Sequence, residues 1–468
     1  MAACMVIQTS ASQTIKQKID SLIAETPFLQ TSEVGIIVYD LNQQKEVYSH
    51  QAQKLYRPAS IEKVITSVTA LAVLGTDYTM NTALMYTGEI ADSTLHGDLY
   101  VIGGFDPEFM ESDMTQLSNA VSDAGIKHIE GRILADVSMM DSIYWGPGWS
   151  WDDTPESFQP YYSPLMLNRG CVGVTVSPQQ QGQPGVVKVS PASDHYVIEN
   201  HSQTSTPRAG GLEITRQWLT NSNKILVSGN VVRKSGRMVN MFNPKEFFMH
   251  TFRFQLRDQG ISLQNDTIYY DAVPQLGQDS LQAEPVLLAQ VRRPVGQVLK
   301  RALKESDNLS AESLFFHAAK KILSQGKMLT SSDAQEAIDL FMKRKIGANP
   351  NDYEIMDGSG VSLYNYISPW LMLQYLKYAY HNRDFFPVFF DALPVAGVDG
   401  TLKYRMYKTP AFRRIHAKTG TVSGISSLAG YAMRKDGTKY AFVIINQNIL
   451  KSRSARSFQD KICSILTE

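Results

Sequence analysis

The long middle of the chain differs in pattern from both ends, and this contrast constrains the fold more than any other feature. Residues from about 85 to 290 hold short apolar runs separated by Gly, Pro, Asn and Asp, a pattern typical of short β-strands. The segments before and after this stretch combine helical periodicity with long apolar strands. We therefore predict a domain of strands and helices, built from residues 1–85 and 290–468, that is split in sequence by a β-rich insertion at 86–289.

The first flanking segment gives clear signals for individual elements. Val34–Tyr39 is a β-branched run typical of a buried strand, and residues 46–49 can return beside it to make a hairpin. A helix is predicted from Pro58, with apolar residues at helical spacing until Gly75 ends it.

The second flanking segment is predicted to begin with helices and to end with strands. After Pro294, apolar stripes predict two helices, and residues 332–335 fit a capping box for a third. Strands are predicted over 426–434 and 439–447, joined by an Asp-Gly turn, before a last helix at about 455–466.

Composition excludes several classes of protein. Lys and Arg (45) balance Asp and Glu (45), so the formal net charge of zero argues against a partner nucleic acid. The nine histidines form no HExxH motif, and the three cysteines have no metal-ligand spacing, so we predict no metal and no other cofactor. Cys171 and Cys463 are either a disulfide or two buried thiols, and the sequence leaves both open.

No membrane span and no leader are predicted. The longest apolar stretch, residues 64–74, is too short to cross a bilayer and contains hydroxyl side chains. Met1–Thr9 lacks the basic region and apolar core of a signal peptide, so the protein is either cytoplasmic or has lost a leader. Lipid attachment at Cys4 is not favoured, because no apolar segment precedes it.

Ser60 and Lys63 form an S-x-x-K motif at the start of the helix that follows Pro58. Residues three apart lie on one face of a helix, so the lysine would stand beside the serine. A serine needs a base to become a nucleophile, and both the helix dipole and burial favour the neutral lysine that could act as one. The alternative is a capping serine with a solvated lysine.

Two further motifs carry polar groups. Ser306-Asp-Asn308, between two predicted helices, offers a hydroxyl that could relay a proton and an amide that could bind a substrate; otherwise it is a helix break. Lys418-Thr-Gly420 fits a strand edge, where Gly420 leaves room for a substrate and Thr419 suits an anionic group. Otherwise the lysine protects an exposed β-edge.

The order of the three motifs is more informative than any one of them. S-x-x-K, then S-D-N, then K-T-G is the trio of penicillin-interacting serine enzymes. No G-x-S-x-G elbow occurs, which argues against an α/β-hydrolase.

With these motifs the sequence resembles the D-alanyl-D-alanine carboxypeptidase/endopeptidase family, the low-molecular-mass class C penicillin-binding proteins. The long gap between the first two motifs is similar to the inserted domains of that family. Further similar segments are 57–63, 97–107, 131–136, 357–362 with Asn365, 398–402 and 416–424. One departure is Leu363-Tyr364, which stand where the family often has an Arg, and this puts a ligand contact by an Arg there in doubt.

The resemblance implies a fold. It implies an α/β (α+β) domain like that of penicillin-binding serine transpeptidases and β-lactamases, in which helices flank an antiparallel sheet. It also implies that the insertion holds two β-rich subdomains, at about 86–170 with 262–289 and at 171–261.

The resemblance also implies a mechanism. Ser60 attacks the carbonyl between two terminal D-alanines, Lys63 accepts its proton, and water later hydrolyses the acyl-enzyme. Ser306 relays a proton to the leaving nitrogen, and Lys418 keeps that path electropositive. The remaining implied contacts are Asn308 to the substrate peptide, Thr419 to its terminal carboxylate, Gly420 beside it, and the backbone N–H groups of Ser60 and Thr421 as oxyanion hole.

The partners implied by the resemblance are a peptidoglycan peptide ending in D-Ala-D-Ala and, as inhibitors, β-lactams. The resemblance also implies that the protein is exported to the periplasm or the cell surface, with its leader removed. Two alternatives stay open: a non-catalytic peptidoglycan-binding scaffold, and a β-lactamase or esterase on the same fold. An aromatic cluster in the insertion either contacts glycan or peptide or is local core; it comprises Tyr144, Trp145, Trp149 and Trp151.

Overall fold

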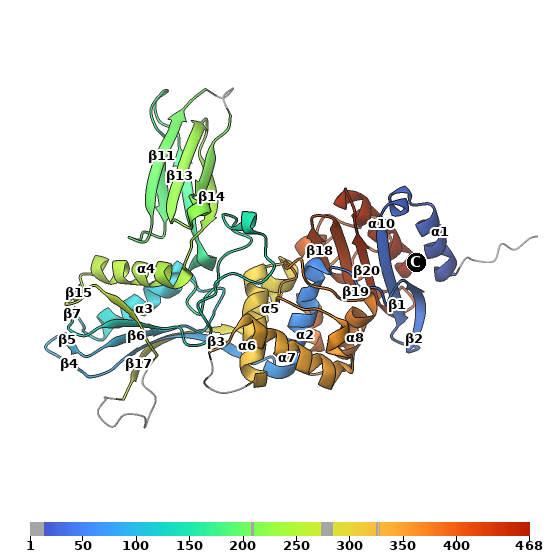
Figure 1. Ribbon diagram of the computed structural model, residues 1–468, viewed down its shortest axis with the longest axis horizontal. Coiled ribbons are helices and arrows are strands. Elements are labelled where there is room, and N and C mark those ends of the chain that lie inside the picture. Colours follow the sequence, from blue (N-terminus) through green and yellow to red (C-terminus); the bar gives the residue numbers. More distant parts are fainter. Residues whose placement is uncertain (1–13, 207–209, 273–283, 324–325, 327) are drawn as a thin grey trace, which may run out of the picture.

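One half of the molecule is organised around a five-stranded antiparallel sheet with strands from both ends of the chain (Figure 1). The computed structural model describes residues 14–206, 210–272, 284–323, 326 and 328–468, so Met1–Thr9 and Cys4 lie outside the described residues. The strand order is β18-β19-β20-β1-β2. The strands are β1 (Glu33–Asp40), β2 (Lys45–His50), β18 (Ile415–Val422), β19 (Ile425–Met433) and β20 (Lys439–Gln447). All four strands predicted in the flanking segments are confirmed.

Helices cover both faces of this sheet, which explains its continuous apolar strands. Ile37 of β1 belongs to the core on one face, whereas Ile36 and Val38 belong to the core on the other. A strand buried on both sides has no polar face, so the run at Val34–Tyr39 does not alternate. The helices on the first side are α2 (Glu62–Leu74), α5 (Val295–Lys304), α6 (Asn308–Leu323), α7 (Ser331–Phe341), α8 (Pro369–His381) and α9 (Phe386–Ala392); those on the second are α1 (Ile15–Ala24) and α10 (Ser452–Thr467).

The ends of two helices show where local signals were accurate and where they were not. The helix predicted from Pro58 begins as a 3-10 turn at Ala59–Ile61, continues as α2, and ends at Gly75, whose φ is +81°. The predicted capping box at 332–335 is wrong by two residues. Thr330 caps α7, and its side chain and that of Asp333 bond reciprocally to the backbone.

The insertion begins and ends on two neighbouring strands. β3 (Thr79–Tyr86) pairs with β17 (Val286–Pro294) along almost its whole length. They are two strands of a mixed sheet ordered β16-β8-β6-β3-β17, beside a smaller sheet ordered β15-β7-β5-β4. The other elements are β4 (Glu89–Ala91), β5 (Thr94–His96), β6 (Leu99–Ile102), α3 (Glu111–Asp123), β7 (His128–Ile129), β8 (Ile133–Asp136), α4 (Pro244–Asp258), β15 (Ser262–Leu263) and β16 (Ile268–Tyr270).

Two three-stranded sheets complete the insertion and project away from its other sheets (Figure 1). Their orders are β10-β9-β14 and β11-β13-β12. The strands are β9 (Cys171–Ser177), β10 (Val186–Ser190), β11 (Val197–Thr204), β12 (Glu213–Arg216), β13 (Lys224–Val231) and β14 (Ser235–Asn240). We propose that these sheets are one subdomain and the preceding sheets the other, with the catalytic domain beginning and ending near the β3–β17 pair.

Three further observations concern the described part of the chain. None of its helices is long and apolar enough to cross a membrane, and none of its His, Cys, Asp and Glu side chains gather into a metal-binding group. Cys171 and Cys463 are both buried and free, so the buried-thiol alternative is confirmed.

Candidate active site

Ser60 lies in the 3-10 turn that leads into α2, and Lys63 lies one turn further on. The Ser60 side chain is half-buried, whereas Lys63 has no exposed surface. Lys63 Nζ is 3.0 Å from Ser60 Oγ, 2.8 Å from Asn308 Oδ1 and 2.6 Å from the Ser359 carbonyl oxygen. The alternative of a solvated lysine at this position is therefore wrong.

The three neighbours of Lys63 suit a neutral amine. Such an amine has two hydrogens, which the Asn308 and Ser359 oxygens can accept, and one lone pair, which then points to the Ser60 hydroxyl. Burial lowers the pKa of Lys63 to about 8, even though nearby carboxylates, Asp357 first among them, oppose the shift. The geometry and the lowered pKa both favour a lysine that can accept a proton.

Ser306 and Lys418 form a second serine–lysine pair. Ser306 is in the left-handed region (φ 61°) between α5 and α6, and its Oγ accepts a hydrogen bond of 2.7 Å from Lys418 Nζ. Lys418 is completely buried in β18, and burial, with the nearby charge of Lys63, lowers its pKa. The alternative of a lysine protecting an exposed edge is therefore wrong.

The edge strand β18 lies directly against the turn that holds Ser60. A Cβ atom on Gly420 would come within 2.1 Å of Ser427 Oγ, 2.8 Å of the Pro58 carbonyl oxygen and 3.0 Å of Ser60 N. No side chain fits at this position, so Gly420 permits the close approach of strand and turn.

Thr419 and Thr421 point their hydroxyls to other segments of the chain. Thr419 Oγ1 is 2.7 Å from Thr401 Oγ1, and Thr421 Oγ1 accepts a hydrogen bond of 3.4 Å from Arg456. Both threonines retain solvent exposure. Thr401 and Arg456 are therefore site residues that the motifs did not identify, although Thr401 lies in the segment 398–402 that resembles the family.

Asn308 joins the insertion to the S-x-x-K motif. Its Oδ1 accepts from Lys63, while its Nδ2 donates to the Phe158 carbonyl oxygen (2.9 Å) and to Gln159 Oε1 (2.8 Å). Both of the last two residues belong to the insertion, and no sequence motif indicated them.

Asp357 holds together the loop that presents the Ser359 carbonyl to Lys63. Its buried carboxylate accepts hydrogen bonds from backbone N–H groups, from the Trp149 ring and from the Asn365 amide. A Cβ on Gly360 would come within 2.1 Å of the Ala59 carbonyl oxygen, so this loop lies tightly against the turn that holds Ser60.

The aromatic cluster divides between core and surface. Trp149 is buried against Tyr162, and Trp145 packs against Trp149, which agrees with the local-core interpretation. Trp151 instead is 58% exposed and lies beside Trp218.

An antiparallel sheet covered by helices, with one serine–lysine pair at the start of α2 and a second that joins Ser306 to the edge strand, defines a penicillin-interacting serine hydrolase. The chain belongs to the D-Ala-D-Ala carboxypeptidase 3 (S13) family, whose family model matches residues 15–468. The prediction of a serine-type D-Ala-D-Ala carboxypeptidase, a low-molecular-mass class C penicillin-binding protein, is thereby confirmed.

Individual relatives agree with the family. The chain is 27% identical over 420 residues to the D-alanyl-D-alanine carboxypeptidase DacB of Haemophilus influenzae, covering 88% of this chain and 85% of that protein. It is also 27% identical over 476 residues to the D-alanyl-D-alanine carboxypeptidase of Actinomadura sp. (strain R39), covering 97% and 84%. The crystal structure of penicillin binding protein 4 from H. influenzae superposes with a TM-score of 0.80 at 26% identity, over 95% of this chain and 97% of that one. This agreement confirms the predicted fold class.

We expect Gly420→Ala to slow acylation of the protein by benzylpenicillin roughly 100-fold, because the new Cβ pushes β18 away from the turn that holds Ser60 by a fraction of an ångström or more. Stopped-flow or quenched-flow acylation rates measure the effect. Gly296→Ala on α5, where a Cβ would meet nothing within 4 Å, is the matched control and should acylate normally. Equal rates for both variants would contradict the proposed close approach.

We expect Asp357→Asn to lower the free energy of unfolding by about 3 kcal/mol, because an amide cannot accept all the bonds that this buried carboxylate accepts. Urea denaturation of the variant and the wild type measures the change. The exposed Asp352→Asn should change it by less than about 0.5 kcal/mol. If Asp357→Asn lowered the free energy of unfolding by no more than Asp352→Asn does, the hydrogen bonds to Asp357 would contribute little to stability.

Proposed function

We propose that Ser60 is the nucleophile and Lys63 its general base. The observation that carries this proposal is the completely buried Lys63 Nζ, 3.0 Å from Ser60 Oγ and bonded to two carbonyl-type oxygens. As Ser60 Oγ bonds to the carbonyl carbon between two terminal D-alanines, its proton passes to Lys63 Nζ. The carbonyl oxygen becomes an oxyanion, which we assign to the backbone N–H groups of Ser60 and Thr421.

We assign collapse of the tetrahedral intermediate to the second pair. The bond to the leaving D-alanine nitrogen breaks as that nitrogen takes a proton from Ser306 Oγ. Ser306 then recovers a proton from the buried lysines. Lys418 Nζ, 2.7 Å from Ser306 Oγ, supports this relay, and we assign it the role of keeping the proton path electropositive. We assign the terminal carboxylate to Thr419 beside Gly420, and a contact with the substrate peptide to Asn308.

Hydrolysis completes the cycle. Water adds to the acyl-enzyme, its proton goes to Lys63, and Ser60 leaves with a proton to give the shortened peptide. The same steps cut a peptide cross-link when the leaving nitrogen belongs to the side chain of a second stem peptide, so we propose DD-endopeptidase activity alongside carboxypeptidase activity. Such substrates lie outside the cytoplasmic membrane, and we propose that the protein works in the periplasm or at the cell surface.

We expect wild-type protein incubated with benzylpenicillin to gain the mass of one drug molecule, and Ser60→Ala to gain nothing, because the β-lactam carbonyl acylates the serine hydroxyl. Intact-mass spectrometry reads both results, and D-alanine release from a pentapeptide follows as the activity assay. No adduct with intact drug would support the scaffold alternative, whereas no adduct with hydrolysed drug would support a β-lactamase.

We expect the acylation rate constant to rise with pH and to level off above about pH 8. The pKa of Lys63 is lowered to about 8, so its neutral, proton-accepting form is scarce at pH 6 and predominates only above pH 8. Rates measured between pH 5.5 and 9.5 test this. Lys63→Arg, whose guanidinium stays protonated, should be slow at every pH. A wild-type rate that falls between pH 6 and 8 would contradict the role of Lys63 as base.

A further inference from the structure

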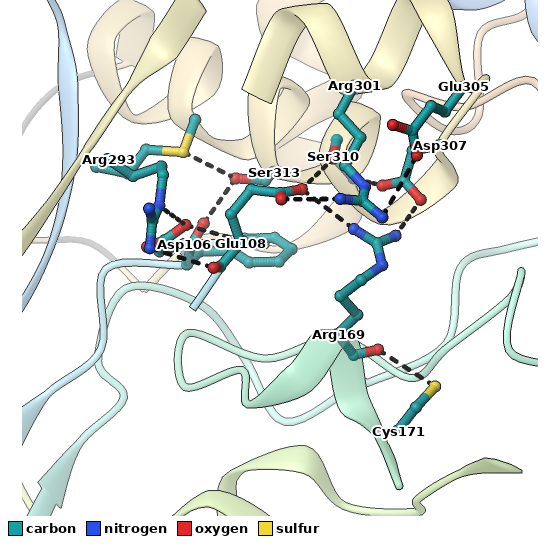
Figure 2. A network of polar contacts seen from close by, with 12 residues as sticks. Asp106, Glu108, Arg169, Cys171, Arg293, Arg301, Glu305, Asp307, Ser310 and Ser313 are labelled. Atoms are coloured by element: carbon teal, nitrogen blue, oxygen red, sulfur yellow. Dashed lines mark hydrogen bonds and ion pairs between the residues drawn. The ribbon is translucent and has the colours of Figure 1, made fainter. Parts of the chain in front are cut away.

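A chain of alternating charges joins the insertion to the S-D-N motif (Figure 2). Arg169, just before β9, directs one guanidinium nitrogen to Asp307 and the other to Glu108, 3.2 Å away. The second oxygen of Glu108 accepts from Arg301 on α5 at 3.1 Å. Asp307 and Arg301 lie on either side of Ser306 in sequence, so the chain of charges spans the segment that holds Ser306.

The geometry of Ser306 explains why such support is needed. Its φ of 61° is a conformation that L-residues other than glycine rarely adopt and that persists only where the surroundings enforce it. Asp307 Oδ1 accepts from the Ser310 backbone N–H at 2.7 Å, which fixes the first turn of α6. The other oxygen of the same carboxylate is the one that Arg169 binds.

Burial makes the contact specific. The side chains of Arg169, Glu108 and Asp307 are only 16%, 8% and 13% exposed, so water cannot readily replace a lost partner. Asp307 is flanked in sequence by the two residues that contact the buried lysines, Ser306 and Asn308. A shift of the Asp307 carboxylate therefore moves both.

We propose that Arg169 is a positioning residue for the proposed acylation step: through Asp307 it holds Ser306 and Asn308 in register with Lys418 and Lys63. The inserted region then contributes directly to the catalytic geometry, in addition to any contact with substrate. This inference rests on the proposed function of the motif residues, and goes beyond it by giving a role to a residue outside all three motifs.

The test is the acylation of Arg169→Met by benzylpenicillin, resolved into the affinity of the first complex and the limiting rate constant. We expect the limiting rate constant to fall roughly 100-fold, the cost of a misplacement of about 1 Å, while the affinity changes much less. Arg169→Lys, which keeps the charge but cannot reach both carboxylates in the same way, should recover part of the rate.

Two controls separate positioning from general destabilisation. Arg253→Met removes an equally buried arginine of the insertion, 12% exposed and paired with Asp194, that has no contact with the S-D-N motif; it should lower stability but keep the wild-type limiting rate. In an Asp307→Asn background, Arg169→Met should cause little further loss of rate, because the contact is already broken.

The outcomes are distinct. A folded Arg169→Met protein with a limiting rate within twofold of wild type would overturn the inference, as would equal losses in Arg169→Met and Arg253→Met. If Arg169→Met does not fold, the limiting rate of Arg169→Lys is compared with those of the wild type and of Arg253→Met in the same way. A wild-type protein that forms no adduct would instead contradict the proposed function itself.

Discussion

The site depends on one buried amine. Lys63 Nζ contacts Ser60 in the turn that leads into its own helix, Asn308 at the start of α6 and the Ser359 carbonyl in the Asp357 loop. Three segments that are far apart in the sequence thus meet at one nitrogen. A buried lysine is costly when charged, so burial itself favours the neutral form of Lys63 that we propose as the base.

The sheet supplies the second constraint. β1, β19 and β20 are fixed by cores on both faces, and β18 extends this sheet at the edge that faces the 3-10 turn of Ser60. Gly420 lets backbone approach backbone there without an intervening side chain. The distance between Ser60 and the strand to which we assign the substrate is therefore set by the packing of the sheet.

Much of this arrangement could be predicted from the sequence, because the signals are local. Apolar runs predicted the strands and helical spacing predicted α2. The three motifs identified the residues that the structure brings together around Lys63 and Lys418. What could not be predicted involves contacts between distant segments. Gln159 and Arg169 reach the S-D-N motif from the insertion, and no spacing rule connects them to it. The prediction placed the capping box of α7 two residues too late, because Ser332 is as good a capping residue by type as Thr330. In the structure Ser332 lies inside the helix.

Backbone strain shows why these distant contacts matter. Ala59, next to Ser60, and Ser306 both have positive φ, which costs roughly 1–2 kcal/mol for each residue that carries a Cβ. Neither segment would hold that conformation alone. Gly360 of the Asp357 loop packs against the Ala59 carbonyl, and Arg169 binds the carboxylate of Asp307, which follows Ser306. Since each strained residue is contacted by a segment remote in sequence, the geometry around Ser60 and Ser306 forms only when loop, insertion and helices have packed together.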